Sequence, residues 1–264
     1  MIERLNAQVF AYAFYSMATV LIISSDERFS AGLQHIMKKV CFSDVSCSVI
    51  DGGVRQKLVI EITCPRKVRT VATAAIDAIA EVVVADCKSY YIQSRVNLPI
   101  EDTVARHAFI RALVTFDRDT DKIITKTLIK LTPEFLLDSF YEFMIDVLKS
   151  RWNEVCHLAN ENMCYLVCRK TFAELLRFLI SNIDSLSEEA HLFLRGDEIE
   201  VLGRGLKPIN DIYINETLPC EIKVVNKLVA IAPKKIFLHQ GDTCFDDRLI
   251  RNIENLFGCC VLVP

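Results

Sequence analysis

The five histidines are the side chains of this sequence best suited to proton transfer near neutral pH, because imidazole titrates at about pH 6.5. No H-E-x-x-H or H-x-x-x-H pattern joins any two of them. His191 and His239 are of interest because each falls in, or at the end of, an expected strand of the C-terminal part. Glu189 lies two residues before His191 and would share its face of the strand.

Two interpretations of His191 and His239 stay open. Two imidazoles on one sheet suit a general acid–base pair or a small-ligand site, in an enzyme or in a binding protein. The other interpretation is a structural, hydrogen-bonded role. We favour it because the sequence supplies no nucleophile motif and no phosphate-binding loop beside them. His191 and His239 are therefore named as binding candidates, and no catalytic residue is assigned.

The eleven cysteines raise the question of metal binding. Cys156, Cys164 and Cys168 would share one helix face, and His157 adjoins the first of them. Structural zinc and iron–sulfur sites need a fourth ligand and other spacings. We predict reduced, mostly buried thiols with no metal and no cofactor. The missing disulfide framework favours a cytoplasmic location.

Motifs of common enzymes and of nucleic-acid-binding proteins are missing from the sequence. Gly203-Arg-Gly205 lacks the third glycine of a phosphate loop, and no serine lies in a G-x-S-x-G elbow. The net charge of -3 and the small basic clusters, which contain no interleaved aromatic residues, exclude a nucleic-acid partner. Hydrophobic residues make up 52% of the chain and leave room for an exposed apolar patch. We expect a non-enzymatic protein that contacts a protein partner or a second copy of itself.

Long helices and strands must position these side chains, because 8 glycines and 7 prolines are few for 264 residues. Residues 1–65 are expected to form a small α/β unit, with Asp26 as a helix N-cap. Asp51-Gly52-Gly53 predicts a hairpin turn, since glycine tolerates the positive φ of tight turns. The expected elements are a strand at Val20–Ile23, a helix at Glu27–Lys39 and hairpin strands at 47–50 and 58–62.

Residues 66–186 are expected to form a helical region, because no glycine occurs between Arg66 and Asp184. We expect four or five helices that break near the two prolines of this span. One helical pattern runs from Val71 to Tyr90.

Thr132-Pro133-Glu134 predicts the start of one of these helices, with threonine as N-cap and proline in the first turn. One apolar side would then comprise Leu136, Phe140, Phe143, Met144 and Val147.

Residues 187–264 are expected to form a C-terminal α/β unit that begins with a hairpin at Gly196-Asp197. A parallel βαβ unit should follow, whose helix ends at Gly258. Its elements are a strand at 236–239, a helix at 246–257 and a strand at 260–263. The sequence thus predicts an α/β fold, mostly helical α+β, with a small N-terminal unit, a helical middle and a C-terminal hairpin plus βαβ unit.

The apolar stretch Val9–Ile23 is shorter than the roughly 20 residues that span a bilayer. Its N-terminal flank has no net positive charge and no clear cleavage site follows it, so a signal peptide is disfavoured. We expect a helix that runs into a buried strand. The alternative is a peripheral membrane segment at residues 9–23.

Five segments of the second half follow one another in a distinctive order. They are Phe140-Tyr-Glu-Phe143 through Trp152, Phe172–Leu179, Glu189–Phe193, Leu228–His239 and Asn255–Val261. In their order and spacing over residues 135–264 they resemble the YtxC-like sporulation proteins of spore-forming Firmicutes, whereas the N-terminal third agrees only in general layout. The resemblance implies a cytosolic protein linked to sporulation, without an established biochemical activity, so it supplies no catalytic residue.

Overall fold

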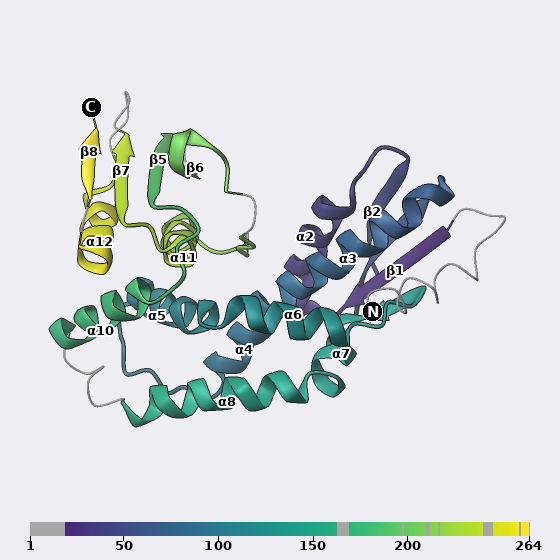
Figure 1. Cartoon of the computed structure of the whole chain (residues 1–264), viewed down its shortest axis with the longest axis horizontal. Coiled ribbons are helices and arrows are strands. Elements are labelled where there is room, and N and C mark those ends of the chain that lie inside the picture. Colours follow the sequence, from purple (N-terminus) through teal and green to yellow (C-terminus); the bar gives the residue numbers. More distant parts are fainter. Residues whose placement is uncertain are drawn as a thin grey trace. The chain divides into compact units, whose positions relative to one another are not determined.

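A computed structural model of the chain describes residues 19–162, 169–196, 198–209, 212–215, 217–239, 245–258 and 260–263 (Figure 1). Contacts between residues divide the chain into two compact units. Unit 1 comprises residues 1–88 and 118–151, and unit 2 comprises residues 89–117 and 152–264. The helical span expected over residues 66–186 therefore contributes to both units, and the chain passes between them three times.

Unit 1 contains a four-stranded sheet in the order β2-β3-β1-β4. Alternating burial along β1 and β3 directs the side chains of Leu21, Ile23, Leu58 and Ile60 into the core. The strand and the glycine hairpin predicted here are confirmed, and Gly53 has the positive φ of 79° that its turn requires. The strands are β1 (Thr19–Ser25), β2 (Val45–Asp51), β3 (Gln56–Ile62) and β4 (Glu134–Leu136).

Two helices of unit 1 approach each other closely at Gly32. This glycine lies in α2 (Ser30–Val40), which follows the 3-10 helix η1 (Glu27–Phe29) and the predicted cap Asp26. A Cβ atom on Gly32 would lie 2.5 Å from Cγ1 of Val82, the last residue of α3 (Val68–Val82). The glycine thus permits close packing of α2 against α3.

The helix predicted over Val71–Tyr90 is confirmed, with one irregular turn. α3 leads through a π-helical turn, η3 (Val83–Cys87), into α4 (Lys88–Gln93) without a break. Short π-helical turns inside helices often mark functional or strained positions. The remaining described elements of the helical middle are η2 (Pro65–Lys67), α5 (Thr103–Thr115), α6 (Arg118–Leu128), α7 (Leu137–Phe143), α8 (Asp146–Glu161) and α10 (Arg169–Ser181).

The helix start predicted at Thr132-Pro133-Glu134 is wrong. Glu134 begins strand β4, which pairs in parallel with β1, and the Ile22 N–H donates to the Pro133 carbonyl at 2.8 Å. The Thr132 hydroxyl donates to the Glu134 carbonyl and does not cap a helix. Pairing with a strand more than a hundred residues earlier therefore overrides the local capping signal.

The apolar side predicted for that helix is also wrong. Phe140 is buried in α7, but Phe143, Met144 and Val147 are 76%, 46% and 59% exposed. The helix ends after Phe143 and a new one, α8, begins at Asp146, so the residues do not form one continuous stripe.

Unit 2 contains the second sheet, in the order β6-β5-β7-β8. β5 pairs antiparallel with β6 and parallel with β7, and β7 pairs parallel with β8, so the predicted hairpin and the parallel pairing of the βαβ unit are confirmed. The predicted Gly258 has a φ of 74° at the C-terminus of the last helix. The elements are β5 (Glu189–Arg195), β6 (Glu198–Leu202), the 3-10 helix η4 (Arg204–Leu206), α11 (Cys220–Ile231), β7 (Lys235–His239), α12 (Asp247–Phe257) and β8 (Val261–Val263).

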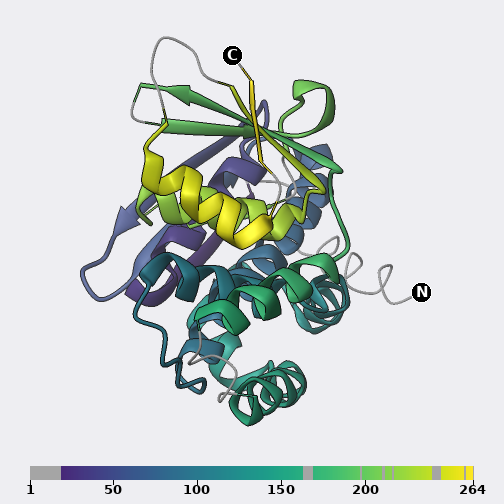
Figure 2. The ribbon, with the colours of Figure 1, turned by 90° about the vertical axis from the view of Figure 1, so that its left-hand side faces the viewer.

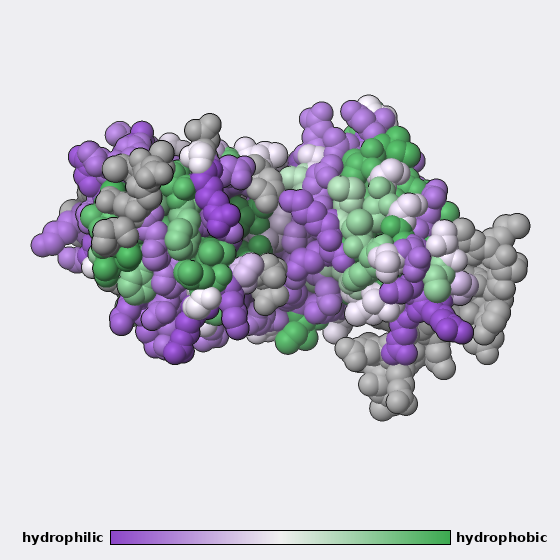
Figure 3. Space-filling view, turned by 90° about the horizontal axis from the view of Figure 1, so that it is seen from above, coloured by the Kyte–Doolittle hydropathy of each residue, from purple (hydrophilic) through white to green (hydrophobic). Residues whose placement is uncertain are grey.

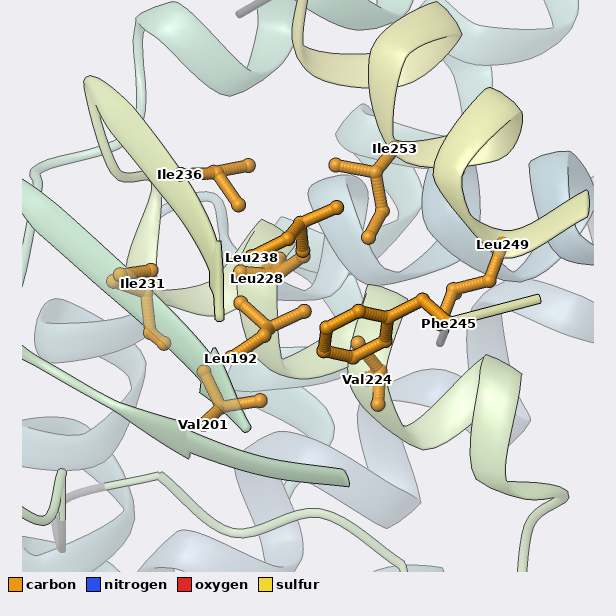
Figure 4. Packing of buried hydrophobic residues seen from close by; sticks show 11 residues of the cluster. Leu192, Val201, Val224, Leu228, Ile231, Ile236, Leu238, Phe245, Leu249 and Ile253 are labelled. Carbon is orange, nitrogen blue, oxygen red and sulfur yellow. The ribbon is translucent and has the colours of Figure 1, made fainter. Parts of the chain in front are cut away.

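Helices α11 and α12 lie on one side of the second sheet (Figure 2). Side chains from the two helices and from β5, β6 and β7 meet in one apolar cluster (Figure 4). The cluster fixes one face of the sheet as the buried face and leaves alternate residues for the other face. Its residues are Ala190, Leu192, Val201, Val224, Leu228, Ile231, Ile236, Leu238, Phe245, Leu249 and Ile253.

The helices and strands confirm the predicted α/β fold, which is mostly helical. Along the sequence, a small N-terminal α/β part is followed by a helical middle and by a C-terminal hairpin with a βαβ unit. Hydrophobic residues also reach the surface, where they form patches between hydrophilic areas on the face drawn in Figure 3. Among the described residues, no helix has both the length and the apolarity to cross a membrane. Residues 19–23 of the apolar N-terminal stretch belong to β1, and the helix expected before them lies outside the described residues.

Candidate functional site

The second sheet brings His191 and His239 together on the face opposite the apolar cluster. On β5 the buried residues Ala190 and Leu192 alternate with His191 and Phe193, and on β7 Ile236 and Leu238 alternate with Phe237 and His239. The cross-strand register sets His191 opposite Phe237 and Phe193 opposite His239. Two imidazoles and two phenyl rings therefore form a block, which we call the histidine face.

The two imidazoles are diagonal neighbours within the histidine face. Nδ1 of His191 lies 2.9 Å from Nε2 of His239, a hydrogen-bond distance. Each imidazole also stacks on the phenyl ring opposite it. The His191 and Phe237 ring centroids are 4.8 Å apart with planes at 12°, and those of Phe193 and His239 are 4.2 Å apart with planes at 6°. Stacking on both strands therefore fixes the planes of the two imidazoles.

The surroundings of His239 disfavour its positively charged form. Partial burial and the adjacent His191 lower the pKa of His239 from its ordinary value. The second nitrogen of His191, Nε2, faces the Glu189 carboxylate at 3.9 Å. Glu189, His191 and His239 thus form a line of a carboxylate and two imidazoles, in which one of the two facing ring nitrogens donates a hydrogen bond to the other. Such a line can accept or release a proton, or offer two nitrogen lone pairs to a ligand.

The cysteine group of the helical middle is described only in part. Cys156 is buried in α8, and His157 beside it is exposed and lies 3.2 Å from Glu161. Cys164 and Cys168 lie outside the described residues. In the described part of the chain, no three or more histidine, cysteine or acidic side chains converge in a way that would hold a metal ion.

An acidic centre in unit 1 was missed by the sequence analysis. Burial by itself would raise the pKa of Glu81, but hydrogen bonds from His35 and Lys122 and the charges of Lys122 and Lys39 lower it to about 2. The His35 and Lys122 contacts measure 2.7 and 2.8 Å. Glu81 is therefore ionised throughout the physiological range and joins α2, α3 and α6.

A fully buried ion pair was missed as well. Lys88 donates to Asp121 at 2.7 Å, and both side chains are 1% exposed. Asp121 also accepts from Nε of Arg151 at 3.3 Å. Charged residues within a helix are usually exposed to solvent. The positions of Lys88 and Asp121 in the sequence therefore give no sign that their side chains are buried.

Three apolar side chains at the junction of α7 and α8 are exposed, although their helical spacing predicted a buried side. Phe143, Met144 and Val147 lie within five residues and are all exposed. We call these three residues the apolar corner. Helical periodicity identified them as apolar but assigned them to a buried side, because periodicity does not say which side meets the core.

Comparison of the chain with protein-family models, with curated proteins and with solved structures finds no match.

Proposed function

We propose that this protein acts in the cytoplasm by binding another protein, rather than by catalysing a reaction, and that it does so during sporulation. The resemblance of residues 135–264 to YtxC-like proteins supports the cellular setting. The seven described cysteines are free thiols, as is usual in a reducing compartment.

The apolar corner is the observation that carries this proposal. Phe143 alone leaves 76% of its surface in water, although burying a phenylalanine side chain is worth roughly 1.5–3 kcal/mol. Clustered exposed apolar side chains mark interaction sites when polar residues surround them. A partner that covers the apolar corner would bury this side chain, and the complex would gain that free energy.

Charged residues adjoin the apolar corner in the sequence. Glu142 pairs with Arg28 at 3.0 Å, and Lys149 donates to the Glu142 carbonyl at 2.8 Å. Asp146 is 82% exposed and pairs with Lys149 at 3.7 Å. An aromatic anchor inside a polar rim is the usual composition of a protein interface.

Site-specific photo-crosslinking tests the proposal in sporulating cells. A benzophenone amino acid at position 143 should give one discrete crosslinked product, whereas the same group at position 54 should not. Val54 is the matched control because it is 84% exposed, also lies in unit 1 and is remote from the corner in sequence. Identical products from both positions, or none from position 143, would refute the proposal. Sedimentation of the purified protein at several concentrations separates a second copy from a different partner.

The effect on the cell is tested by substitution. Phe143→Glu places a charge in the contact and should reduce heat-resistant spores to the level of a strain without the gene. Removal of such an anchor weakens binding by roughly 30-fold or more. Val54→Glu should leave spore formation unchanged, and normal sporulation with Phe143→Glu would contradict the proposal.

A second candidate function is small-ligand binding or acid–base chemistry at the histidine face. It is favoured by the 2.9 Å contact between His191 and His239. Complementation separates the two candidates: a strain that needs His239 but tolerates Phe143→Glu uses the histidine face. The reverse pattern assigns the function to the apolar corner.

A further inference from the structure

We infer that His191 and His239 form a binding site for a divalent transition-metal ion such as Ni²⁺ or Zn²⁺. This inference rests on the second candidate function and names its ligand. The sequence predicted no metal because the two residues are 48 apart and match no metal-binding motif. Cross-strand pairing brings them together.

The separation of the two nitrogens suits one shared ion. Metal–imidazole bonds of about 2.1 Å place their donor atoms about 3.0 Å apart at the right angles of octahedral coordination, and about 3.4 Å apart at the tetrahedral angles usual for Zn²⁺. The observed distance between Nδ1 of His191 and Nε2 of His239 is 2.9 Å. An ion would replace the hydrogen bond between these atoms, and each ring would turn so that its nitrogen lone pair points at the ion and not at the other nitrogen.

The rings are held in position before an ion binds. Each imidazole stacks on a phenyl ring of the neighbouring strand, Phe237 for His191 and Phe193 for His239. Strands hold side chains more precisely than loops do, and a preorganised pair loses less entropy on binding. Imidazole is also a ligand type that zinc, nickel and copper prefer.

Glu189 completes the arrangement on the far side of His191. A metal ion at Nδ1 requires the tautomer of His191 whose proton is on Nε2, the nitrogen that faces the Glu189 carboxylate. Metal-bound histidines usually direct their second N–H to such a carboxylate. One of the two facing nitrogens carries the proton of the hydrogen bond, and this proton moves to the other nitrogen of its own ring when the ion binds. The protein therefore binds the ion without a net change in its own charge.

The ion would keep open coordination positions. Two protein nitrogens fill two of the four to six positions, and water or a donor atom of a ligand fills the others. The histidine face lies on the sheet face opposite the apolar cluster, and the His191 side chain is 14% exposed. The apolar cluster therefore forms no part of the site. The site would hold an oxygen- or nitrogen-bearing small molecule through the ion.

Calorimetric titration with NiCl₂, and in parallel with ZnCl₂, tests the inference on purified protein freed of metal by chelation and dialysis. Wild-type protein should bind one Ni²⁺ saturably. His239→Gln preserves a hydrogen-bonding side chain but removes the imidazole, and it should abolish this binding. Glu189→Gln should weaken it by about tenfold or more, as loss of a carboxylate behind a metal-bound histidine usually does.

His157→Gln is the matched control, because the exposed His157 side chain also faces a carboxylate, that of Glu161, at 3.2 Å. It should bind Ni²⁺ as the wild type does. Circular dichroism of every variant checks that the fold persists. Equal binding by His239→Gln and wild type, or no saturable binding at all, would overturn the inference. If the wild type binds no metal and His239→Gln nevertheless fails to complement, the second candidate function stands and only the metal is refuted.

Discussion

At the scale of single residues, Glu81 ties the stability of unit 1 to pH. Its pKa is about 2 in the folded protein against an ordinary value of 4.5, so its ionised form favours folding. The difference corresponds to about 3 kcal/mol, which is fully present above the ordinary pKa and is lost as the pH falls toward 2.

Glu81→Gln should therefore be less stable than wild type by up to about 3 kcal/mol at pH 6. The gap should narrow by roughly half at pH 3, where the wild type has itself lost part of this contribution. Urea unfolding at the two pH values measures the gap. Glu154→Gln, at an exposed position of α8, should follow the wild type at both. A gap that is the same at pH 3 and pH 6 would contradict the assignment.

Asp121 permits a second prediction at this scale. Asp121→Ala leaves the Lys88 ammonium buried without the carboxylate that it contacts at 2.7 Å, and should cost about 3–5 kcal/mol. Replacing both residues by apolar ones, as in Lys88→Met with Asp121→Leu, should recover most of that loss. The double variant has no charged group at this buried position, so folding removes no charge from water there. Chemical denaturation compares the three proteins. A double variant as unstable as Asp121→Ala would show that the ion pair is not the cause.

At the scale of secondary-structure elements, the contact of α2 with α3 depends on Gly32. Gly32→Ala normally strengthens a helix, but here the new Cβ would lie 2.5 Å from Cγ1 of Val82. We expect a net loss of about 1–3 kcal/mol from the overpacked contact. Val82→Ala removes the clashing methyl groups, so adding Gly32→Ala to it should cost less than in the wild type, or stabilise. A double-mutant cycle by urea unfolding measures this coupling.

Short-range sequence signals predicted most helices and strands. Elements that depend on contacts between residues far apart in the sequence were not predicted. Asp26, Gly53 and Gly258 act within a few residues, and each occupies the turn or cap that its sequence predicted. β4 was missed because its strand character comes from β1, and three residues of local sequence cannot reveal that pairing.

The sequence identified His191 and His239 as residues of the candidate site, but it did not predict the contact between them. Strand alternation places His191 and His239 on one face once both strands are known. The diagonal contact between them depends on the register of β5 with β7, which is fixed by the core packed against α11 and α12. The exposure of Phe143 depends in turn on the break between α7 and α8, for which the sequence has no glycine or proline.

At the scale of the whole molecule, each unit is assembled from two separated segments. Unit 1 needs residues 118–151 for β4, for α6 and for Asp121, and in unit 2 α5 packs against α11. A fragment of residues 1–117 should therefore unfold in urea without a cooperative transition, whereas the full chain should unfold cooperatively. A fragment of residues 152–264 should likewise lack one, because it has lost α5. Cooperative unfolding of either fragment, followed by circular dichroism, would disprove this dependence.

The late position of β4 also has a consequence during translation. β1, β2 and β3 leave the ribosome about 70 residues before β4, which at roughly 5–20 residues per second is an interval of about 4–14 s. During that interval the edge of β1 that later receives β4 offers its backbone N–H and C=O groups to any neighbouring nascent chain. The yield of folded protein should therefore depend on chaperone supply and on the speed of synthesis between residues 62 and 134.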